Sequence, residues 1–347
     1  MGRKNILIGF DGFIDTIVRA VDYYDGDNKV FIRFIDQFGK RISAAAGRSA
    51  NIELDIVCKK IGGNGPILSE ALRLLGATTT YIGTLGDVHE NIFKTFAQKN
   101  KAISVGMPGE TRAIEFDDGK ILLGEMHDTA KIDADSICSA CNKNMLREIV
   151  SKNELLCFVN WTMLPRMHSI FELFLTDIID VHAAHTFFFD LADPSKRTKE
   201  DISKLINYIQ RFSRIGPSIL GLNLSEAQHI LSVLGCQDKV IESEDSMLKC
   251  ARLIRSGIGC KVVFIHANTM SVGCDDNAVF VTGYFSEHPK VSTGAGDHFN
   301  AGFLFDYLDN QNIKSALHMG SAVAKYYVEH GDSPDEMQAR SIIQRAI

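Results

Sequence analysis

The stretch "KVSTGAGDHFNAGF", residues 290–303, places Gly294, Ala295 and Gly296 directly before the acid Asp297. Glycines let backbone N–H groups converge, and a helix start adds a positive partial charge, so this pattern predicts a site for phosphate oxygens. A carboxylate beside such a site suits phosphoryl transfer to an alcohol, because it can take the hydroxyl proton. In a simpler interpretation Asp297 only caps the helix or favours its dipole.

The same stretch differs from two common nucleotide-binding loops. No G-x-x-x-x-G-K-[ST] pattern occurs in the chain, and Phe299 stands where the third glycine of G-x-G-x-x-G would be. The sequence therefore predicts an anion site of another kind.

Two turns near the N-terminus carry polar residues, and ligands of open α/β sheets lie beyond such strand ends. Gly63 and Asn64 in "IGGNGP" could admit a ligand near the backbone and bind its hydroxyl groups, although a tight turn explains the glycines as well. Asp11 and Asp15 in "GFDGFIDTI" could accept hydrogen bonds from a polyol. A turn at Asp11-Gly12 accounts for Asp11 better than for Asp15.

A third turn, "GLNLSEAQHI", places Asn223 and Glu226 three residues apart at a helix start. An amide and a carboxylate there could order water around Mg²⁺. Ordinary capping, with Ser225 as the N-cap, accounts for the stretch equally well.

Composition sets the broad class. The chain has 347 residues, of which 45% are hydrophobic and 23% charged, and its formal net charge is −6. No basic stripe favours nucleic acid, and the apolar N-terminal run is too short for a signal peptide or a membrane span. The eight cysteines, including the Cys138/Cys141 pair, fit unlinked thiols in a reducing compartment. We therefore expect a cytoplasmic protein that binds neither nucleic acid nor membrane.

Apolar strand-like runs alternate with amphipathic helical runs, which predicts a doubly wound, mostly parallel sheet covered on both faces. Strands are expected at 5–9, 79–86, 155–161, 185–193, 218–224 and 261–267, and helices at 66–76, 91–100, 167–181, 199–212 and 225–235.

Two segments break this rhythm. Residues 29–61 show strand-like alternation without a clear helix, and residues 111–125 predict a hairpin turning at 117–119. We expect one α/β domain, 1–347, with a small lid sheet whose strands fall within about 16–60 and 106–130. A peripheral hairpin without a binding role fits the same pattern. Exposed edges of such a sheet favour pairing with a second copy, which leaves a homodimer open.

Taken in order, these pieces resemble the PfkB/ribokinase family of carbohydrate and nucleoside kinases over nearly the whole chain. "STGAGDHFNAGF" is similar to the C-terminal signature of the family, and "GGNGPILSEALRLLGA" with "YIGTLGD" resembles the N-terminal one. "FFFDLADPSKR" is similar to its strand ending in Asp-Pro and a basic residue, and "GLNLSEA" to its N-x-x-E motif.

The resemblance implies a ribokinase-like core with a β-sheet lid, ATP and Mg²⁺ as cofactors, and a sugar or nucleoside as acceptor. It implies Asp297 as the catalytic base, beside an anion hole formed by the amides of Gly294, Ala295 and Gly296. By position, the resemblance further implies that Asn223 and Glu226 lie at the Mg²⁺–phosphate end, with Glu226 as the metal ligand. Asp15 or Asp11, together with Gly63 and Asn64, would bind the acceptor. The nucleotide would lie along the segment from His266 to Val281, which includes Asn268, and against the helix near Ala322.

The chain also departs from the family. Val291 and Ser292 stand where the family usually has Asp-Thr, which leaves dependence on a monovalent cation open. His266-Ala267-Asn268 replaces the usual Thr-x-Gly, which leaves the choice of nucleotide open.

The residues thus favour an ATP-dependent kinase acting on a sugar or nucleoside hydroxyl. The two departures also allow a sensor that binds sugar or nucleotide without transferring phosphate, and such a protein would release no ADP. A nicotinamide-dependent dehydrogenase would need a glycine fingerprint after the first strand, which the sequence does not have.

Overall fold

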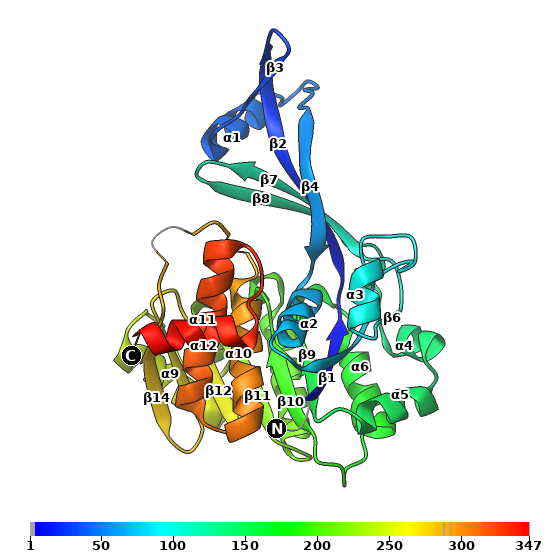
Figure 1. Ribbon diagram of the computed structural model, residues 1–347, viewed down its shortest axis with the longest axis vertical. Coiled ribbons are helices and arrows are strands. Elements are labelled where there is room, and N and C mark those ends of the chain that lie inside the picture. The colour runs from blue at the N-terminus through cyan, green and yellow to red at the C-terminus, as the bar shows by residue number, and fades with distance from the viewer. Residues whose placement is uncertain (1–3, 287–288, 292, 347) are drawn as a thin grey trace.

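The computed structural model, which describes residues 4–286, 289–291 and 293–346, consists of a large core and a smaller projecting sheet that we call the lid (Figure 1). The core sheet runs in the order β14-β13-β12-β11-β10-β9-β1-β5-β6, parallel except where β13 pairs with β12 and β14. Its strands are β1 (Asn5–Phe10), β5 (Thr78–Gly83), β6 (Ile103–Ser104), β9 (Leu155–Phe158), β10 (Thr186–Asp190), β11 (Ser218–Asn223), β12 (Val262–His266), β13 (Met270–Cys274) and β14 (Ala278–Thr282).

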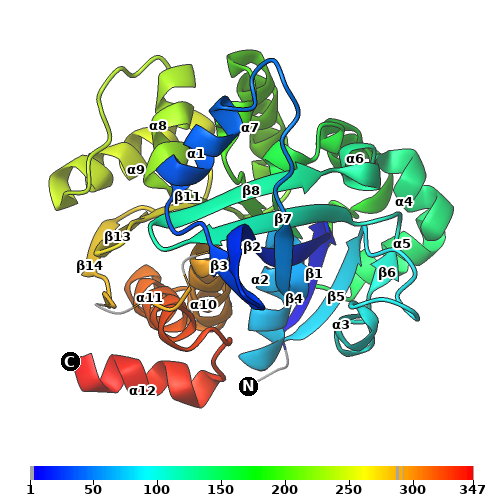
Figure 2. The same ribbon diagram turned by 90° about the horizontal axis from the view of Figure 1, so that it is seen from above.

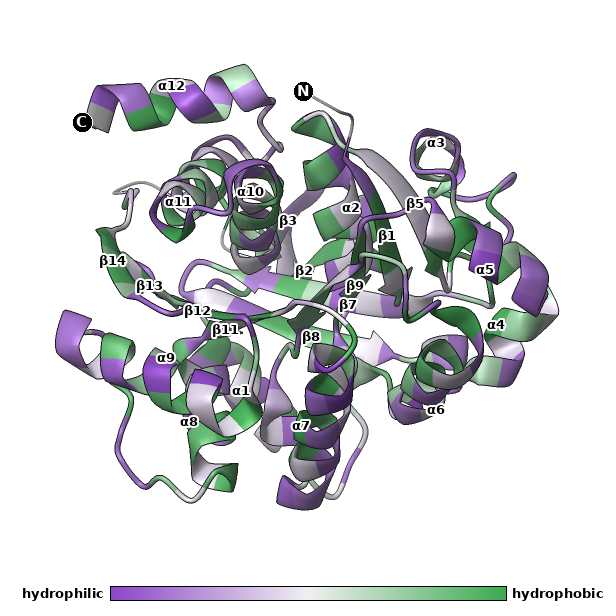
Figure 3. Cartoon of the chain, turned by 90° about the horizontal axis from the view of Figure 1, so that it is seen from below, coloured by the Kyte–Doolittle hydropathy of each residue, from purple (hydrophilic) through white to green (hydrophobic). Residues whose placement is uncertain are grey.

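Helices cover both faces of this sheet, as Figures 2 and 3 show. One face carries α2 (Asn64–Leu74), α3 (Lys94–Lys99), α10 (Ala295–Asn310) and α11 (Ile313–His330), with α12 (Glu336–Ala346) packed outside α11. The other face carries α4 (Ala134–Ala140), α5 (Lys143–Ser151), α6 (Met167–Leu173), α7 (Lys199–Ser213), α8 (Leu224–Val233) and α9 (Glu244–Ile258). Alternate residues of β1 explain the two layers, since Leu7 packs into one apolar cluster and Ile8 into the other.

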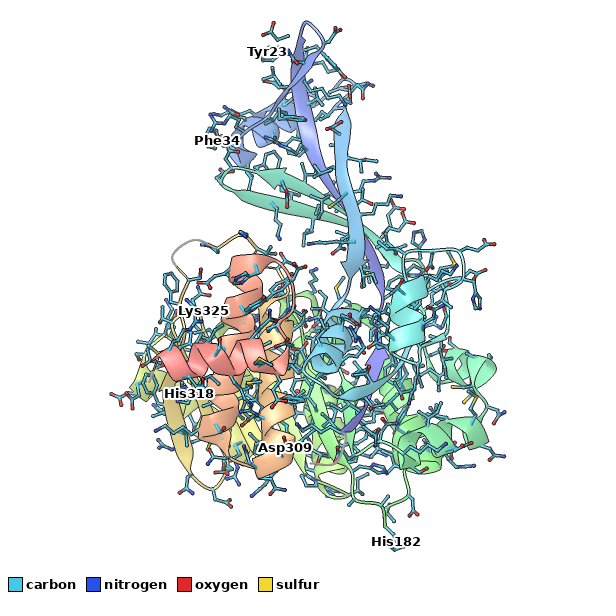
Figure 4. The ribbon with its side chains drawn as sticks, in the orientation of Figure 1. Tyr23, Phe34, His182, Asp309, His318 and Lys325 are labelled. Carbon is cyan, nitrogen blue, oxygen red and sulfur yellow. The ribbon has the colours of Figure 1, made fainter. Side chains whose placement is uncertain are left out.

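The lid consists of β2 (Phe13–Asp25), β3 (Asn28–Phe31), β4 (Leu54–Gly62), β7 (Gly109–Phe116), β8 (Gly119–Glu125) and the helix α1 (Ile35–Ser43). It stands beyond the core in Figure 1, and Tyr23 and Phe34 mark its outer part in Figure 4. Helix α1 covers one lid face, where Phe38 packs on Phe116 with ring centroids 5.3 Å apart. The lid therefore has a small apolar core of its own.

The predicted α/β class and doubly wound sheet are confirmed, and so is the hairpin, which β7 and β8 form around residues 117 and 118. One local prediction was wrong. Residues 29–61 contain α1, which the strand-like runs on either side and the mid-helix Gly39 concealed. Asp11 and Gly12 form the short connection between β1 and the 13-residue strand β2, which begins at Phe13.

The cysteines of the described chain are all free thiols, Cys138 partly exposed and Cys141 buried at the end of α4. Across the same residues, no helix combines the length and apolar character needed to cross a membrane.

Candidate active site

Four neighbouring core strands end in polar residues at one edge of the sheet. Asp11 follows β1, Asn160 follows β9, and Asp190 and Asn223 end β10 and β11. The chain runs from β1 outward to β5 on one side and from β9 to β12 on the other, so this edge includes the point where strand order reverses. Crevices at such points are where open α/β sheets bind ligands.

Asp11 belongs to this polar cluster at the strand ends and is fully buried. Its carboxylate accepts hydrogen bonds from the Gly65 amide at 2.9 Å and from Asn160 Nδ2 at 2.6 Å. Burial raises the pKa of Asp11 to about 6, and these hydrogen bonds lower it only in part. Gly63 lies against the same carboxylate, since a Cβ there would come within 2.6 Å of Asp11 Oδ2, and its φ is +94°. Both observations require glycine at that position.

Asp190 connects the strand ends to two helices. Its Oδ2 accepts a hydrogen bond from Asn300 Nδ2 of α10 at 2.9 Å, and its Oδ1 lies 3.5 Å from Asn64 Nδ2 of α2. The side-chain oxygens of Asn160 and Asn300 are buried and have no hydrogen-bond partner among the described residues. A polar cluster with unpaired acceptors of this kind is suited to water, a cation or a hydroxyl ligand.

Asp297 lies in the first turn of α10, directly beside this polar cluster, and is 8% exposed. Burial raises the pKa of Asp297 well above its usual range, and the nearby carboxyls of Asp190 and Asp11 raise it further. A hydrogen bond from Asn64 acts in the opposite direction. Asp297 therefore holds a proton far more strongly than an exposed carboxylate does.

The start of α10 presents backbone amides at the same place. Gly294 is the N-cap with φ +90°, which glycine adopts readily. Within the described ranges, no acceptor bonds the amides of Gly294, Ala295 or Gly296. Free amides at the start of a 16-residue helix form a site that attracts phosphate oxygens.

A cleft of about 910 Å³ opens from these amides across the ends of β11 and β12 toward α11. Asn223, His266, Asn268, Ala295 and Gly296, all predicted site residues, line it. His266 stacks on Phe299 with centroids 4.9 Å apart, and burial lowers the pKa of His266 to about 4. This histidine therefore presents a neutral ring beside Gly296.

Ala322, a predicted nucleotide-binding residue, lies away from the cleft surface. Ala322 is fully buried and does not line the cleft. Its neighbours Ser321, Ala324 and Lys325 on α11 do. Figure 4 shows Lys325 on this helix, with His318 farther from the lid. The Lys325 ammonium donates to the Phe285 carbonyl at 2.8 Å, which ties the cleft rim to α11.

Asn223 and Glu226 form a reciprocal cap on α8. Asn223 Oδ1 accepts from the Glu226 amide at 2.9 Å, and Glu226 Oε2 accepts from the Asn223 amide at 2.8 Å. Asn223 is therefore the N-cap, and the prediction of Ser225 was wrong by two residues. Burial raises the pKa of Glu226 well above its usual range, with Asp190 adding to the effect.

A divalent cation fits this end of the cleft only with help from other ligands. No three His, Cys, Asp or Glu side chains of the described residues come together as a metal site. Mg²⁺ commonly binds one or two carboxylates and keeps water or phosphate oxygens as its other ligands. Glu226 and Asp190 are buried carboxyls, and burial is the main cause of their raised pKa values. A nearby cation would favour their ionised forms.

Asp15 belongs to the lid rather than to the strand-end cluster. It is half-buried in β2, opposite Lys60 of β4 and Thr111 of β7. Burial raises the pKa of Asp15, while Thr111, Lys60 and Lys120 lower it. Asp15 also raises the pKa of Tyr327 on α11, whose hydroxyl bonds the Thr293 carbonyl just before α10.

Three residues of the crevice were absent from the predicted site. Asn160 comes shortly after the buried strand β9, and Asp190 ends the buried strand β10. The strand-end rule could therefore have found both. Asn300 lies within a helix, and only its contact with Asp190 identifies it. Ser292 lies outside the described residues.

Several solved structures with this fold are named as kinases. The chain aligns with a probable sugar kinase from Rhizobium etli at a TM-score of 0.69 and 15% identity, covering 100% of this chain and 99% of that one. An adenosine kinase from Sinorhizobium meliloti gives 0.68 and 15%, covering both chains fully. Ribokinase from Thermotoga maritima gives 0.67 and 14%, covering 99% and 100%. The protein thus has the fold of the ribokinase/PfkB sugar and nucleoside kinases.

The sequence narrows this class. The family model described as prokaryotic ketohexokinase matches residues 1–345, and the chain belongs to this family. A curated ketohexokinase from Haloferax volcanii is 24% identical over 345 residues, which cover 96% of this chain and 90% of that protein. The protein is accordingly a phosphotransferase with an alcohol group as acceptor.

Proposed function

We propose that the protein transfers the γ-phosphoryl group of ATP to a hydroxyl group of a ketohexose, with D-fructose as the first candidate. The observation that carries the proposal is the buried carboxyl of Asp297 beside amides at the start of α10 that no described acceptor bonds. Ala295 and Gly296 line the 910 Å³ cleft on one side, and on the other Asp297 lies near the polar cluster of Asp11, Asn64 and Asp190, which shift its pKa. The name of the curated relative supports a ketohexose over a nucleoside.

The proposed roles follow from this geometry. ATP would lie in the cleft, its triphosphate toward the amides of Gly294, Ala295 and Gly296, with Asn223 and His266 along the wall. Glu226 would act from behind this wall, where it is buried and caps α8 with Asn223. Mg²⁺, when bound, would neutralise charge on the phosphates. Asp15, Gly63 and Asn64 would hold the hydroxyl groups of the sugar, between the lid and the crevice floor.

Asp297 would take the proton of the attacking hydroxyl as its oxygen bonds to the γ-phosphorus and ADP leaves. Its raised pKa makes Asp297 a stronger base than an ordinary carboxylate, provided that it is ionised. A cation near Glu226 and Asp190 would favour that ionised form. The amides would stabilise the charge spread over the transferring group.

A panel of acceptors tests the proposal. The protein is incubated with ATP and Mg²⁺ and with D-fructose, ribose, a 2-keto-3-deoxy sugar acid or adenosine, and ADP release is measured. We expect acceptor-dependent release that is fastest with the ketohexose. The same preparation of Asp297→Asn controls for contaminating kinases. Ligand binding without ADP release for every acceptor would favour a sensor instead.

Two further properties stay predictions. A homodimer would be tested by light scattering, and exposed lid side chains such as Tyr23 (58%) and Leu122 (55%) favour it. Dependence on a monovalent cation would be tested by replacing sodium with potassium in the same assay.

A further inference from the structure

Two stacked rings bind two consecutive carbonyl groups of the glycine-rich turn. The Tyr327 hydroxyl of α11 donates to the Thr293 carbonyl at 2.9 Å, and His298 Nδ1 of α10 lies 2.7 Å from the Gly294 carbonyl. The rings of Tyr327 and His298 stack with centroids 3.7 Å apart and planes 12° from parallel. The turn before α10 is therefore held by a pair of rings from two helices.

The hydrogen bonds fix the protonation of the histidine. A carbonyl oxygen only accepts, so Nδ1 of His298 carries the proton that bonds Gly294. Nε2, 2.7 Å from Ser333 Oγ, then accepts from that hydroxyl in the neutral ring. Burial lowers the pKa of His298 to about 4 and raises the pKa of Tyr327 to about 12, so both groups keep these roles near neutral pH.

Because the peptide bond is planar, a hydrogen bond to a carbonyl oxygen also fixes the direction of the N–H in the same peptide unit. The Thr293 carbonyl and the Gly294 N–H belong to one rigid peptide plane and point in opposite directions. The Gly294 carbonyl and the Ala295 N–H share the next plane. Holding the two oxygens therefore helps to set the direction of two of the three amides assigned to the phosphoryl group. The Gly294 oxygen also accepts the backbone N–H of His298 at 3.1 Å, so the ring adds a second, shorter bond to it. A hydrogen bond to a carbonyl also polarises its peptide and makes the N–H a stronger donor.

We propose that His298 and Tyr327 are positioning residues for phosphoryl transfer: together they aim the amides of Gly294 and Ala295 at the transferring group. The inference rests on the proposed function of those amides. Neither ring needs to touch a substrate, since each bonds the side of the peptide plane that faces away from the N–H. The contribution is to preorganisation, so it should affect kcat more than the KM of the acceptor.

A second tyrosine–histidine pair on α11, Tyr326 and His330, provides a matched control. Tyr326 and His330 also stack, with centroids 4.0 Å apart, and His330 Nδ1 lies 2.8 Å from the carbonyl of Tyr326 itself. The Tyr326 hydroxyl accepts from Gln338 Nε2 at 2.8 Å. This second pair has the same ring types, and among the described residues it makes no side-chain hydrogen bond to the glycine-rich turn.

The test compares kcat, acceptor KM and melting temperature across variants of the full chain. Tyr327→Phe keeps the stack and removes the bond to Thr293, and we expect kcat to fall about 10-fold; His298→Ala should lower it about 10²-fold. The acceptor KM should change less than about threefold in both. Tyr326→Phe and His330→Ala should leave kcat unchanged.

Two conservative substitutions separate positioning from simple packing. The side-chain amide of His298→Asn can occupy the place of Nδ1 and bond Gly294, whereas that of His298→Gln reaches toward Ser333 instead. We expect His298→Asn to recover most of the lost kcat and His298→Gln to recover little. Equal kcat for the two variants, or wild-type kcat in Tyr327→Phe, would overturn the proposal even if melting temperatures fall. Failure of the proposed function shows differently, as absent turnover in the wild type or full turnover in Asp297→Asn.

Discussion

Asp11 and Asp15 are four residues apart in the sequence, yet they belong to opposite walls of the proposed acceptor site. Asp11 is part of the core floor, where the Gly65 amide and Asn160 occupy its carboxylate. Asp15 is part of the lid, half-buried, with Lys60 and Thr111 across from it on neighbouring strands. The hydrogen bonds of Asp11 are satisfied by the protein, whereas Asp15 keeps acceptor capacity for a ligand.

This difference suggests a division of labour. The core aspartate fixes the loop at Gly63 and Asn64, and so acts on the acceptor through backbone geometry. The lid aspartate sits on the smaller sheet, which has its own apolar cluster and joins the core through short connections (Figure 1). Substitutions of the two residues should therefore differ in kind, one affecting stability and the other substrate affinity.

Of the two aspartates, Asp11 has the larger expected effect, which is on the pH dependence of stability. Its pKa rises from 3.8 to about 6 on folding, so between these values the unfolded chain ionises while the folded carboxyl stays protonated. Stability is then lost as pH rises through that window, by about 3 kcal/mol. Asp11→Asn removes this titration, at a constant cost for the weakened hydrogen bonds.

Urea unfolding of both proteins at pH 4, 5, 6 and 7 measures the effect. The free energy of unfolding of the wild type, relative to Asp11→Asn, should fall between pH 4 and 6 and then level off. A difference that is independent of pH would show that Asp11 titrates normally, as an exposed residue does.

A smaller effect is expected on the lid. Asp15→Asn keeps the size of the side chain and removes its charge, so it should raise the KM for the acceptor about 10- to 100-fold, the value of one charged hydrogen bond. The kcat should change little. Glu110→Gln is the control, because Glu110 is exposed and its β7 side chain alternates with Thr111, away from Asp15. An unchanged KM in Asp15→Asn would assign acceptor binding to the core alone.

The sequence was most informative where glycine and polar residues follow buried strands. The strand-end rule placed Asn223, because strand ends of a parallel sheet share one edge. Asp297 was found from the glycine-rich helix start before it, and His266 and Asn268 from the resemblance to the kinase family. The doubly wound core followed from the alternation of apolar runs, since strands buried on both faces carry a continuous signal.

Prediction was weaker where tertiary contacts decide the structure. Helix α1 has apolar residues at helical spacing, Ile35, Phe38 and Ile42, but it is nine residues long and contains Gly39, so the helical signal was weak beside the strand-like runs on either side. Asn300 and Tyr327 act through partners 110 and 34 residues away, and no local pattern indicates such contacts. Ala322 lies on a helix beside the cleft, as expected, but on the buried face of that helix. Which face of a helix borders a cleft depends on how the helix packs, and the local sequence does not give this.

The central claim is that Asp297 takes the hydroxyl proton, and steady-state turnover of Asp297→Asn tests it most directly. Asp309→Asn, at the far end of the same helix, is the control, since Asp309 pairs with Lys4 at 2.7 Å (Figure 4). We predict that Asp297→Asn folds normally and loses about 10²- to 10⁴-fold in kcat, while Asp309→Asn turns over like the wild type. Turnover of Asp297→Asn within about threefold of the wild type would contradict the account.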